Sequence, residues 1–225
     1  MTRTALFLLA SVPALLGQTR TAPMNASEQK NLAMVLTWWR EVIEARHTEL
    51  ADKYQAEDYI QHDPNVLTGR APMIAYFEHV GKPINPIPEK LTLPPVVQGA
   101  KGDFVWLIFE DTATRTYTFD ILRIQNGKVQ EHWDADQRIP GSPAFVPYPG
   151  PPPSTWNTGT VSPAERRNLG VAMKGESSKS KRPPVLTLVN GPYVLLMWEH
   201  KNKEATWNSF AAVRVENGRV EQKWN

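Results

Sequence analysis

The chain has 225 residues, of which 41% are hydrophobic, 9% aromatic and 21% charged, a composition that excludes disorder or a fibrous repeat for most of it. With 25 basic and 23 acidic side chains, the formal net charge of +2 gives no strong field for a polyphosphate, so nucleic acid is not an expected partner. The chain has no cysteine, which excludes disulfides, thiolate zinc sites, iron–sulfur clusters and a cysteine nucleophile.

The N-terminus has the pattern of a secretory signal peptide. Arg3 is followed by an apolar run from Ala5 to Leu16, which is shorter than the roughly 20 apolar residues of a membrane span. We assign residues 1–22 to this signal, with the cleavage site left open between Gly17 and Met24. A secreted or periplasmic protein without membrane contact after cleavage is expected, and a frayed N-terminal helix is the alternative.

The next segment predicts helices followed by strands. Apolar residues recur at helical spacing from Leu32 to Ile43, with Ser27 as the N-cap. Two shorter helices are predicted over 48–54 and 72–80, and strands over 91–97, 104–110, 115–124 and 128–134. Helices followed by a meander indicate an α+β fold. The strand 104–110 is apolar on both faces, so the sheet needs a cover on each side, and the helices provide only one.

A Pro-rich linker, residues 139–161, leads into a second copy of the sheet sequence. Segments 94–97, 102–110, 119–134 and 28–32 return as 183–186, 191–199, 210–225 and 165–169. This half-repeat, residues 162–225, has a polar run at 175–181 in place of the second and third helices, so it cannot enclose a pocket of its own. We expect its apolar sheet to cover the first one as an internal pseudo-dimer. A homo-oligomer of whole chains is the alternative.

The turn at Asn126-Gly127 decides which side chains share a face of the sheet. A two-residue turn pairs Asp120 with Trp133 and separates Asp120 from His132. A three-residue loop with Gly127 in the left-handed conformation pairs Ile124 with Lys128 and places Asp120 opposite His132. We favour the three-residue loop, which brings Asp120, His132 and Asp134 to one face.

The two copies differ at the residues that can carry chemistry. Asp120, His132 and Asp134 become Ala211, Lys223 and Asn225 in the second copy, whereas the apolar positions persist. Residues that the sheet does not need are candidates for a functional site in the first copy. Free drift of exposed strand residues is the alternative explanation.

Two motifs carry a family resemblance. Residues 58–65 (Asp-Tyr-Ile-Gln-His-Asp-Pro-Asn) with Gly69-Arg70, and residues 119–134, resemble the SnoaL-like polyketide-cyclase branch of the nuclear transport factor 2-like superfamily. The resemblance covers residues 27–138, our SnoaL-like domain, and the half-repeat only in its sheet. It implies a cone of helices against a curved antiparallel sheet, with a pocket between them.

The resemblance also implies where the chemistry lies. Family members use an aspartate or histidine at the pocket wall as a general acid/base, and the matching positions are His62, His132 and Asp134, with Asp120 as a further polar group. Residues implied to bind the substrate are Tyr59, Phe77, Trp39 and Leu122. A buried carboxylate has a raised pKa and can take a proton from carbon beside a carbonyl, while Tyr59 or His62 holds the enolate oxygen.

We therefore expect an exported aldol-type cyclase, isomerase or lyase that acts on a small hydrophobic carbonyl compound without a cofactor or metal. A non-catalytic ligand-binding or assembly module of the same fold is the alternative. A metal site of two histidines with carboxylates is a third reading, which no tight ligand spacing supports. The truncated second copy and the signal peptide depart from the family, whose cyclases work inside the cell.

Overall fold

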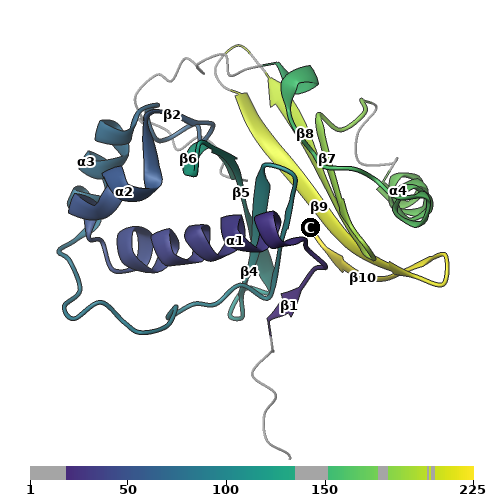
Figure 1. The fold of residues 1–225 in the computed structure, drawn as a ribbon, viewed down its shortest axis with the longest axis horizontal. Helices are drawn as coiled ribbons and strands as arrows, with labels where there is room; N and C mark the ends of the chain where they lie inside the picture. Colours follow the sequence, from purple (N-terminus) through teal and green to yellow (C-terminus); the bar gives the residue numbers. More distant parts are fainter. Residues whose placement is uncertain (1–18, 135–151, 177–181, 202, 204–205) are drawn as a thin grey trace, which may run out of the picture.

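A computed structural model describes residues 19–134, 152–176, 182–201, 203 and 206–225. Figure 1 shows two sheets that lie face to face, with helices α1 to α3 on the outer side of one and helix α4 on the outer side of the other. Most of the predicted signal peptide, the linker up to residue 151 and most of the polar run at 175–181 lie outside the described residues.

The helical layer begins with α1 (Ala26–Trp38). Its N-cap is Asn25 and not the predicted Ser27, because Asn25 accepts the backbone N–H of Glu28 while the Glu28 carboxylate accepts the backbone N–H of Asn25. The chain continues as a π-helix, η1 (Trp39–Glu44), a 3-10 turn, η2 (Thr48–Leu50), a short α2 (Ala51–Tyr54) and α3 (Arg70–Val80). The predicted helices are therefore present, with α3 beginning two residues earlier than expected.

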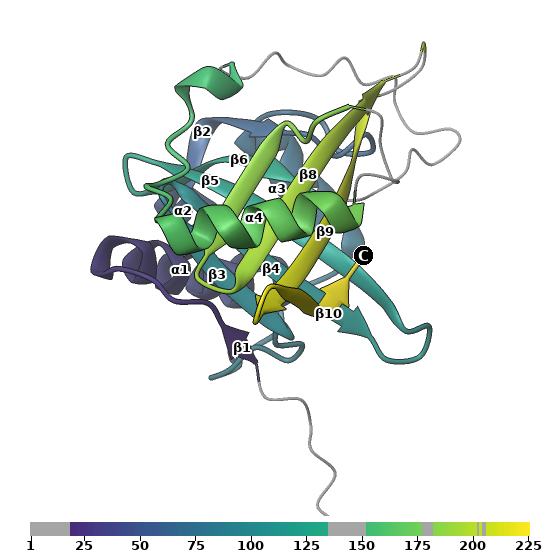
Figure 2. The ribbon, with the colours of Figure 1, turned by 90° about the vertical axis from the view of Figure 1, so that its right-hand side faces the viewer.

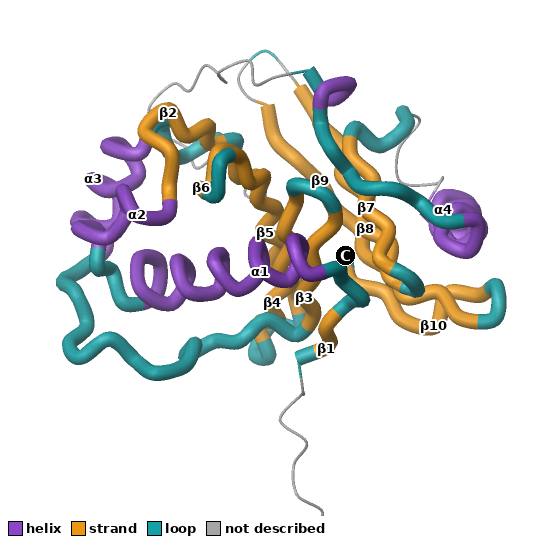
Figure 3. Tube along the Cα trace, in the orientation of Figure 1, coloured by secondary structure: helices purple, strands orange, loops and turns teal. Residues whose placement is uncertain are grey.

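The first sheet has six strands in the order β1-β3-β4-β5-β6-β2. Their bounds are β1 Arg20–Thr21, β2 Gln55–Gln61, β3 Val97–Lys101, β4 Phe104–Asp111, β5 Thr116–Gln125 and β6 Lys128–Trp133. The two outer strands, β1 and β2, pair in parallel with their neighbours, so the sheet is mixed and not the simple meander that the sequence predicted. The tube in Figure 3 shows β2 beside β6, with α3 next to β2.

One predicted strand is wrong. The segment 91–96 is not a strand, and β3 begins only at Val97. Pro94 and Pro95 have no backbone N–H and cannot contribute to a ladder, which explains why pairing starts after them. The sequence analysis predicts no strand between the second and third helices, so β2 is an addition to the predicted elements.

The second sheet is antiparallel, with the order β10-β9-β8-β7, and α4 (Pro163–Glu176) lies across its outer face (Figure 2). The strands are β7 Leu186–Asn190, β8 Tyr193–Lys201, β9 Thr206–Glu216 and β10 Arg219–Trp224. A 3-10 turn, η3 (Pro153–Thr155), precedes Trp156, whose ring packs against Phe104 and Trp133. The described end of the linker is thus packed against the first sheet.

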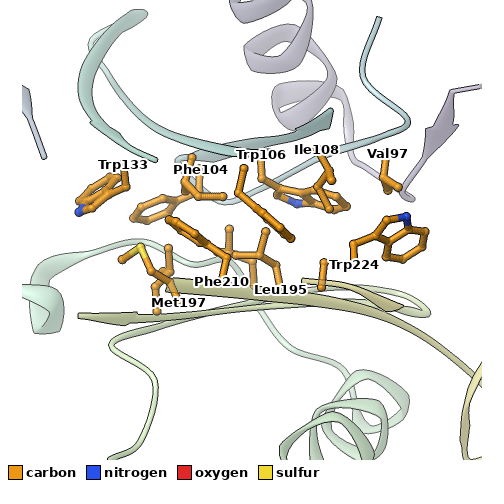
Figure 4. Close-up of a cluster of buried hydrophobic side chains, with 14 of the residues drawn as sticks. Val97, Phe104, Trp106, Ile108, Trp133, Leu195, Met197, Phe210 and Trp224 are labelled. Carbon is orange, nitrogen blue, oxygen red and sulfur yellow. The ribbon is translucent and has the colours of Figure 1, made fainter. Parts of the chain in front are cut away.

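Buried apolar side chains join the two sheets (Figure 4). Phe104, Trp106, Ile108 and Trp133 from the first sheet meet Leu195, Met197, Phe210 and Trp224 from the second. Burial of apolar area contributes about 25 cal/mol per Å2, so a contact of this kind is a large term in the stability of the chain. A second cluster lies between the first sheet and the helices, and a third lies between the second sheet and α4.

Positions that the sequence comparison aligns make similar polar contacts within each half, and two of them also bind the other half. Glu28 accepts the N–H of Gly102, and its aligned counterpart Glu165 accepts the N–H of Gly191, so each glutamate fastens its helix to a hairpin turn. Lys101 reaches across to Glu165 at 3.0 Å, and its counterpart Asn190 donates to the carbonyl oxygens of Ala100 and Pro23. Lys101 and Asn190 thus each bind the other half of the chain, although through different partners.

Residues 20–22 fall within the segment predicted as a signal peptide, yet they belong to the fold. Arg20 and Thr21 pair with β3, and Ala22 is buried in the cluster between the sheets. Within the described residues, none of the helices combines the length and apolar character that crossing a membrane requires.

Candidate functional site

A pocket of about 160 Å3 lies between the helices and the first sheet. It is lined by Trp38, Trp39, Ile43, Tyr59, Gln61, Asp63, Val66, Met73, Tyr76, Phe77, Asp120, His132 and Asp134. The helices α1, η1 and α3 supply only apolar and aromatic side chains to this list, whereas the polar groups come from the sheet and the ends of its strands. Its volume is similar to that of a cavity of about 150 Å3 that holds one benzene ring.

Asp120, His132 and Asp134 form a polar wall of the pocket. This wall depends on a β-bulge that the sequence did not reveal. The turn at Asn126-Gly127 has two residues, both with positive φ (52° and 73°), and Gln125 pairs with Lys128. The predicted three-residue loop is therefore wrong. Ile124 pairs with Val129, however, and Arg123 pairs with Glu131, so one extra residue, Gln130, interrupts the ladder.

Because of the bulge, Asp120, His132 and Asp134 still share one face, although the predicted pairing of Asp120 with His132 is wrong. Beyond it, Leu122 lies opposite His132, and Asp120 and Asp134 are each two residues further along their strands. Because strand side chains alternate between faces, Asp120, His132 and Asp134 all face the pocket. The same turn and bulge occur at Asn217-Gly218 and between Val220 and Gln222 in the second sheet.

His132 is the centre of the polar wall. Its Nε2 lies 2.9 Å from Oδ1 of Asp120, and its Nδ1 lies 3.1 Å from Oε1 of Gln61 and 3.9 Å from Oδ2 of Asp134. The ring and the Asp120 carboxylate are both buried. A histidine and carboxylates in such contact can store and transfer a proton.

The charges around the pocket shift the titration of its members. Burial by itself lowers the pKa of His132, but the hydrogen bond to Asp120 and the charges of Asp134, Asp120 and Asp63 outweigh it and raise the pKa above its ordinary value. The pKa of Tyr59 is well above its ordinary value, because the phenol is buried and the same carboxylates lie near it. The raised pKa favours the imidazolium form of His132, and the raised pKa of Tyr59 keeps its phenol a hydrogen-bond donor.

Strand β2 supplies pocket residues that sequence reasoning missed. Gln61 pairs in parallel with His132, and the backbone N–H of His62 donates to the carbonyl oxygen of His132. Tyr59, Gln61 and Asp63 alternate along this segment and line the pocket. Period-two spacing around His62 was the signal that could have found Gln61 and Asp63, once the segment was recognised as a strand.

His62 does not join the pocket, which corrects its expected catalytic role. It alternates with Gln61 and Asp63, so its ring lies on the other side of the sheet, stacked on Trp133 with centroids 4.5 Å apart. Its Nε2 lies 3.1 Å from Oε2 of Glu131, a fully buried carboxylate that also accepts from Arg123. His62 thus helps to satisfy a buried ion pair.

Of the four residues predicted to bind a substrate, three line the pocket and one does not. Tyr59, Phe77 and Trp39 line the pocket as expected for residues that contact a substrate. Leu122 is fully buried in the core between the helices and the sheet and is not part of the pocket lining. Among the described residues, no group of three or more His, Asp or Glu side chains has the arrangement of a metal site.

No family profile and no curated protein sequence matches the chain. Among solved structures, an NTF2-like protein of unknown function from Mesorhizobium loti is 11% identical, covering 51% of this chain and 96% of its own, with a TM-score of 0.37. An LEH-like epoxide hydrolase from M. tuberculosis is 9% identical, covering 49% and 81%, with a TM-score of 0.36. A protein with a ketosteroid isomerase-like fold from Catenulispora acidiphila, in complex with trimethylamine, is 15% identical, covering 45% and 82%, with a TM-score of 0.33. These alignments span about half of this chain, and at these TM-scores they assign no activity to it.

Proposed function

We propose that the pocket is a general acid/base site that transfers a proton on a small hydrophobic carbonyl compound, as in an aldol-type cyclase, an isomerase or a lyase. One observation carries the proposal: the buried ring of His132 lies between the carboxylates of Asp120 and Asp134 on the wall of an aromatic pocket. Desolvation of this kind is how proteins adjust acids and bases to neutral pH.

In this proposal, Asp134 takes the proton. A carboxylate oxygen accepts hydrogen from the carbon beside the carbonyl, and the C–H electron pair moves into an enolate whose oxygen becomes negative. The phenol of Tyr59 donates a hydrogen bond to that oxygen, and its raised pKa keeps the donor protonated. Asp120 is the partner of His132, whose positive charge stabilises both carboxylates. Return of the proton from Asp134 to another carbon gives an isomer. Attack of the enolate carbon on a second carbonyl of the same molecule gives a ring, whose new alkoxide takes the proton back from Asp134.

The size and lining of the pocket define the substrate class. A volume of about 160 Å3 takes one ring or a chain of similar size, with any larger part of the molecule outside the pocket. Trp38, Trp39 and Phe77 offer flat apolar surfaces to such a ring. We therefore expect cyclic ketones and short aromatic or aliphatic carbonyl compounds as substrates.

Hydrogen–deuterium exchange tests the proposed step without knowledge of the product. Small carbonyl compounds are incubated with the full chain in D2O, and NMR follows the loss of the signal from the hydrogen beside the carbonyl. We expect faster exchange for at least one compound and a loss of about 10^2- to 10^4-fold in Asp134→Asn. The exposed carboxylate variant Asp52→Asn is the matched control and should exchange at the wild-type rate.

Exchange that persists at the wild-type rate in the Asp134→Asn, His132→Asn double variant would overturn the proposal. Saturable binding of library compounds without any exchange would favour the alternative, a ligand-binding module. The aromatic lining of the pocket is the observation that supports this second function.

We further propose that the chain is an internal pseudo-dimer, in which the half-repeat takes the place of a second subunit. The stacking of Phe119 on its aligned counterpart Phe210 supports this, because a two-fold interface brings equivalent residues together. The shared turn and bulge near the end of each sheet support it as well. Size-exclusion chromatography with light scattering should give a monomer for the full chain, and a stable dimer of whole chains would contradict it.

We also propose that the protein is exported, and the buried N-terminal residues narrow the range of the cleavage site. Cleavage after Ala22 would remove β1 and a buried residue from the fold, whereas cleavage between Gly17 and Arg20 would preserve both. We expect N-terminal sequencing of the protein from its native host to begin at residue 18, 19 or 20. A product that keeps Met1 would contradict export.

A further inference from the structure

Gln61 lies at the end of β2 and has no part in the proposed chemistry. Its side chain is buried, and it pairs with His132 in the parallel ladder between β2 and β6. Nδ1 of His132 lies 3.1 Å from its Oε1. Either residue could donate the hydrogen of this bond, because an imidazole nitrogen can either donate or accept.

Two backbone N–H groups decide which residue donates this hydrogen. Oε1 of Gln61 accepts the backbone N–H of His62 at 3.0 Å and that of Asp63 at 3.4 Å. A backbone N–H only donates, so the side-chain atom that faces both groups is the oxygen and not the amide nitrogen. An amide oxygen only accepts, and Nδ1 of His132 must therefore carry the hydrogen of the bond that joins them.

The other nitrogen of the ring also faces an acceptor. Nε2 of His132 lies 2.9 Å from Oδ1 of Asp120 on β5. In a neutral ring, one of the two nitrogens would turn a lone pair toward an oxygen, and one hydrogen bond would be lost. The imidazolium makes both bonds.

The remaining titratable groups around the ring favour the same form. Asp134, after β6, and Asp63, after β2, are carboxylates on the same pocket wall, and Tyr59 on β2 is a neutral phenol. The lining residues from α1, η1 and α3 carry no charge, and the phenol of Tyr76 is the titratable group among them.

We propose that Gln61 is a positioning residue that keeps Nδ1 of His132 protonated, so that His132 is a fixed cation and the carboxylates alone accept protons in the pocket. This deepens the proposed function, because it decides which group takes the proton. Its test requires no substrate, so that failure of the proposed reaction and failure of this inference are distinguishable.

The test is an NMR titration of full-length protein labelled with 15N-histidine, with the His132 signals identified by their loss in His132→Asn. We expect both ring nitrogens of wild-type His132 to show the protonated signature at pH 7. In Gln61→Met, which has a similar length but no acceptor, we expect about tenfold weaker proton binding and a neutral ring with its hydrogen on Nε2, bonded to Asp120. Gln61→Glu restores an acceptor and should restore the wild-type signature.

Two further variants keep the test decisive. Gln130→Met removes an amide of the same size from the neighbouring strand, where it binds Asp58, and should leave the titration of His132 unchanged. In Asp120→Asn, the neutral ring should carry its hydrogen on Nδ1, because Gln61 then dominates. A neutral wild-type ring at pH 7, an Nε2–H form in Asp120→Asn, or a wild-type titration in Gln61→Met would each overturn the inference, and the first two do not depend on Gln61→Met folding.

Discussion

Phe119 and Phe210, which occupy aligned positions in the two halves of the chain, stack on each other with ring centroids 5.4 Å apart and an interplanar angle of 8°. Such a contact is expected near the two-fold axis of the pseudo-dimer that we propose. The two rings therefore report directly on the contact between the sheets.

Truncation of either ring should weaken the whole molecule. We expect Phe119→Ala and Phe210→Ala each to lower the free energy of unfolding by about 3–5 kcal/mol, with a coupling of about 0.5–1.5 kcal/mol in the double variant. Urea denaturation followed by tryptophan fluorescence measures both values. Phe109 packs on the helical side of the first sheet, so Phe109→Ala should show no coupling to Phe210→Ala.

Glu165 should make the contact between the halves sensitive to acid. Burial alone would raise its pKa, but the N–H groups of Ser162 and Gly191 and the Lys101 ammonium lower it from 4.5 to about 2. A depressed pKa gives stability that is present above pH 4.5 and is lost as the pH falls toward 2, up to about 3 kcal/mol.

Denaturation at pH 7, 5 and 3 checks this prediction. At neutral pH, Glu165→Gln should be less stable than the wild type. Between pH 5 and 3 it should therefore lose much less free energy of unfolding than the wild type does. Lys101→Met removes only one of the partners and should give an intermediate slope. Equal pH dependence in the wild type and Glu165→Gln would show that Glu165 does not carry the effect.

Two glycines in similar turns should respond differently to alanine. Gly102 and Gly127 both have left-handed backbone, with φ of 59° and 73°. A Cβ on Gly102 would lie 2.1 Å from the carbonyl oxygen of Asn157, whereas a Cβ on Gly127 meets nothing within 4 Å. We expect Gly127→Ala to cost about 1–2 kcal/mol from backbone strain alone. Gly102→Ala should cost clearly more in thermal unfolding, and equal costs would mean that residues 157–159 do not pack on this turn.

Removal of the half-repeat should expose an apolar sheet face. A fragment that ends at Gly150 loses the partners of Phe104, Trp106 and Ile108, and soluble monomers rarely expose an apolar patch above about 600 Å2. We expect this fragment to aggregate or to form homodimers in light scattering, while the full chain stays monomeric. A soluble monomeric fragment as stable as the full chain would contradict the internal pseudo-dimer.

Local pattern and internal comparison established much of the fold and part of the site. Helical spacing from Leu32 onward gave α1, and runs of apolar residues gave β4 to β6. The comparison of 119–134 with 210–225 pointed to Asp120, His132 and Asp134, which line the pocket, because Ala211, Lys223 and Asn225 stand at the aligned positions. These are properties of neighbouring residues, or of two segments compared with each other.

Tertiary structure alone decided the rest. The ladder between β2 and β6 joins residues about 70 positions apart, and nothing within 55–61 indicates that partner. The bulge at Gln130 is equally invisible, since Asn126-Gly127 fits either turn, and only packing of the Asp120 and His132 side chains under the helices fixes their face. His62 and Gln61 are adjacent in the chain, yet the alternation of a strand sends one to Glu131 and the other to His132, because pairing with β6 sets which face each residue occupies.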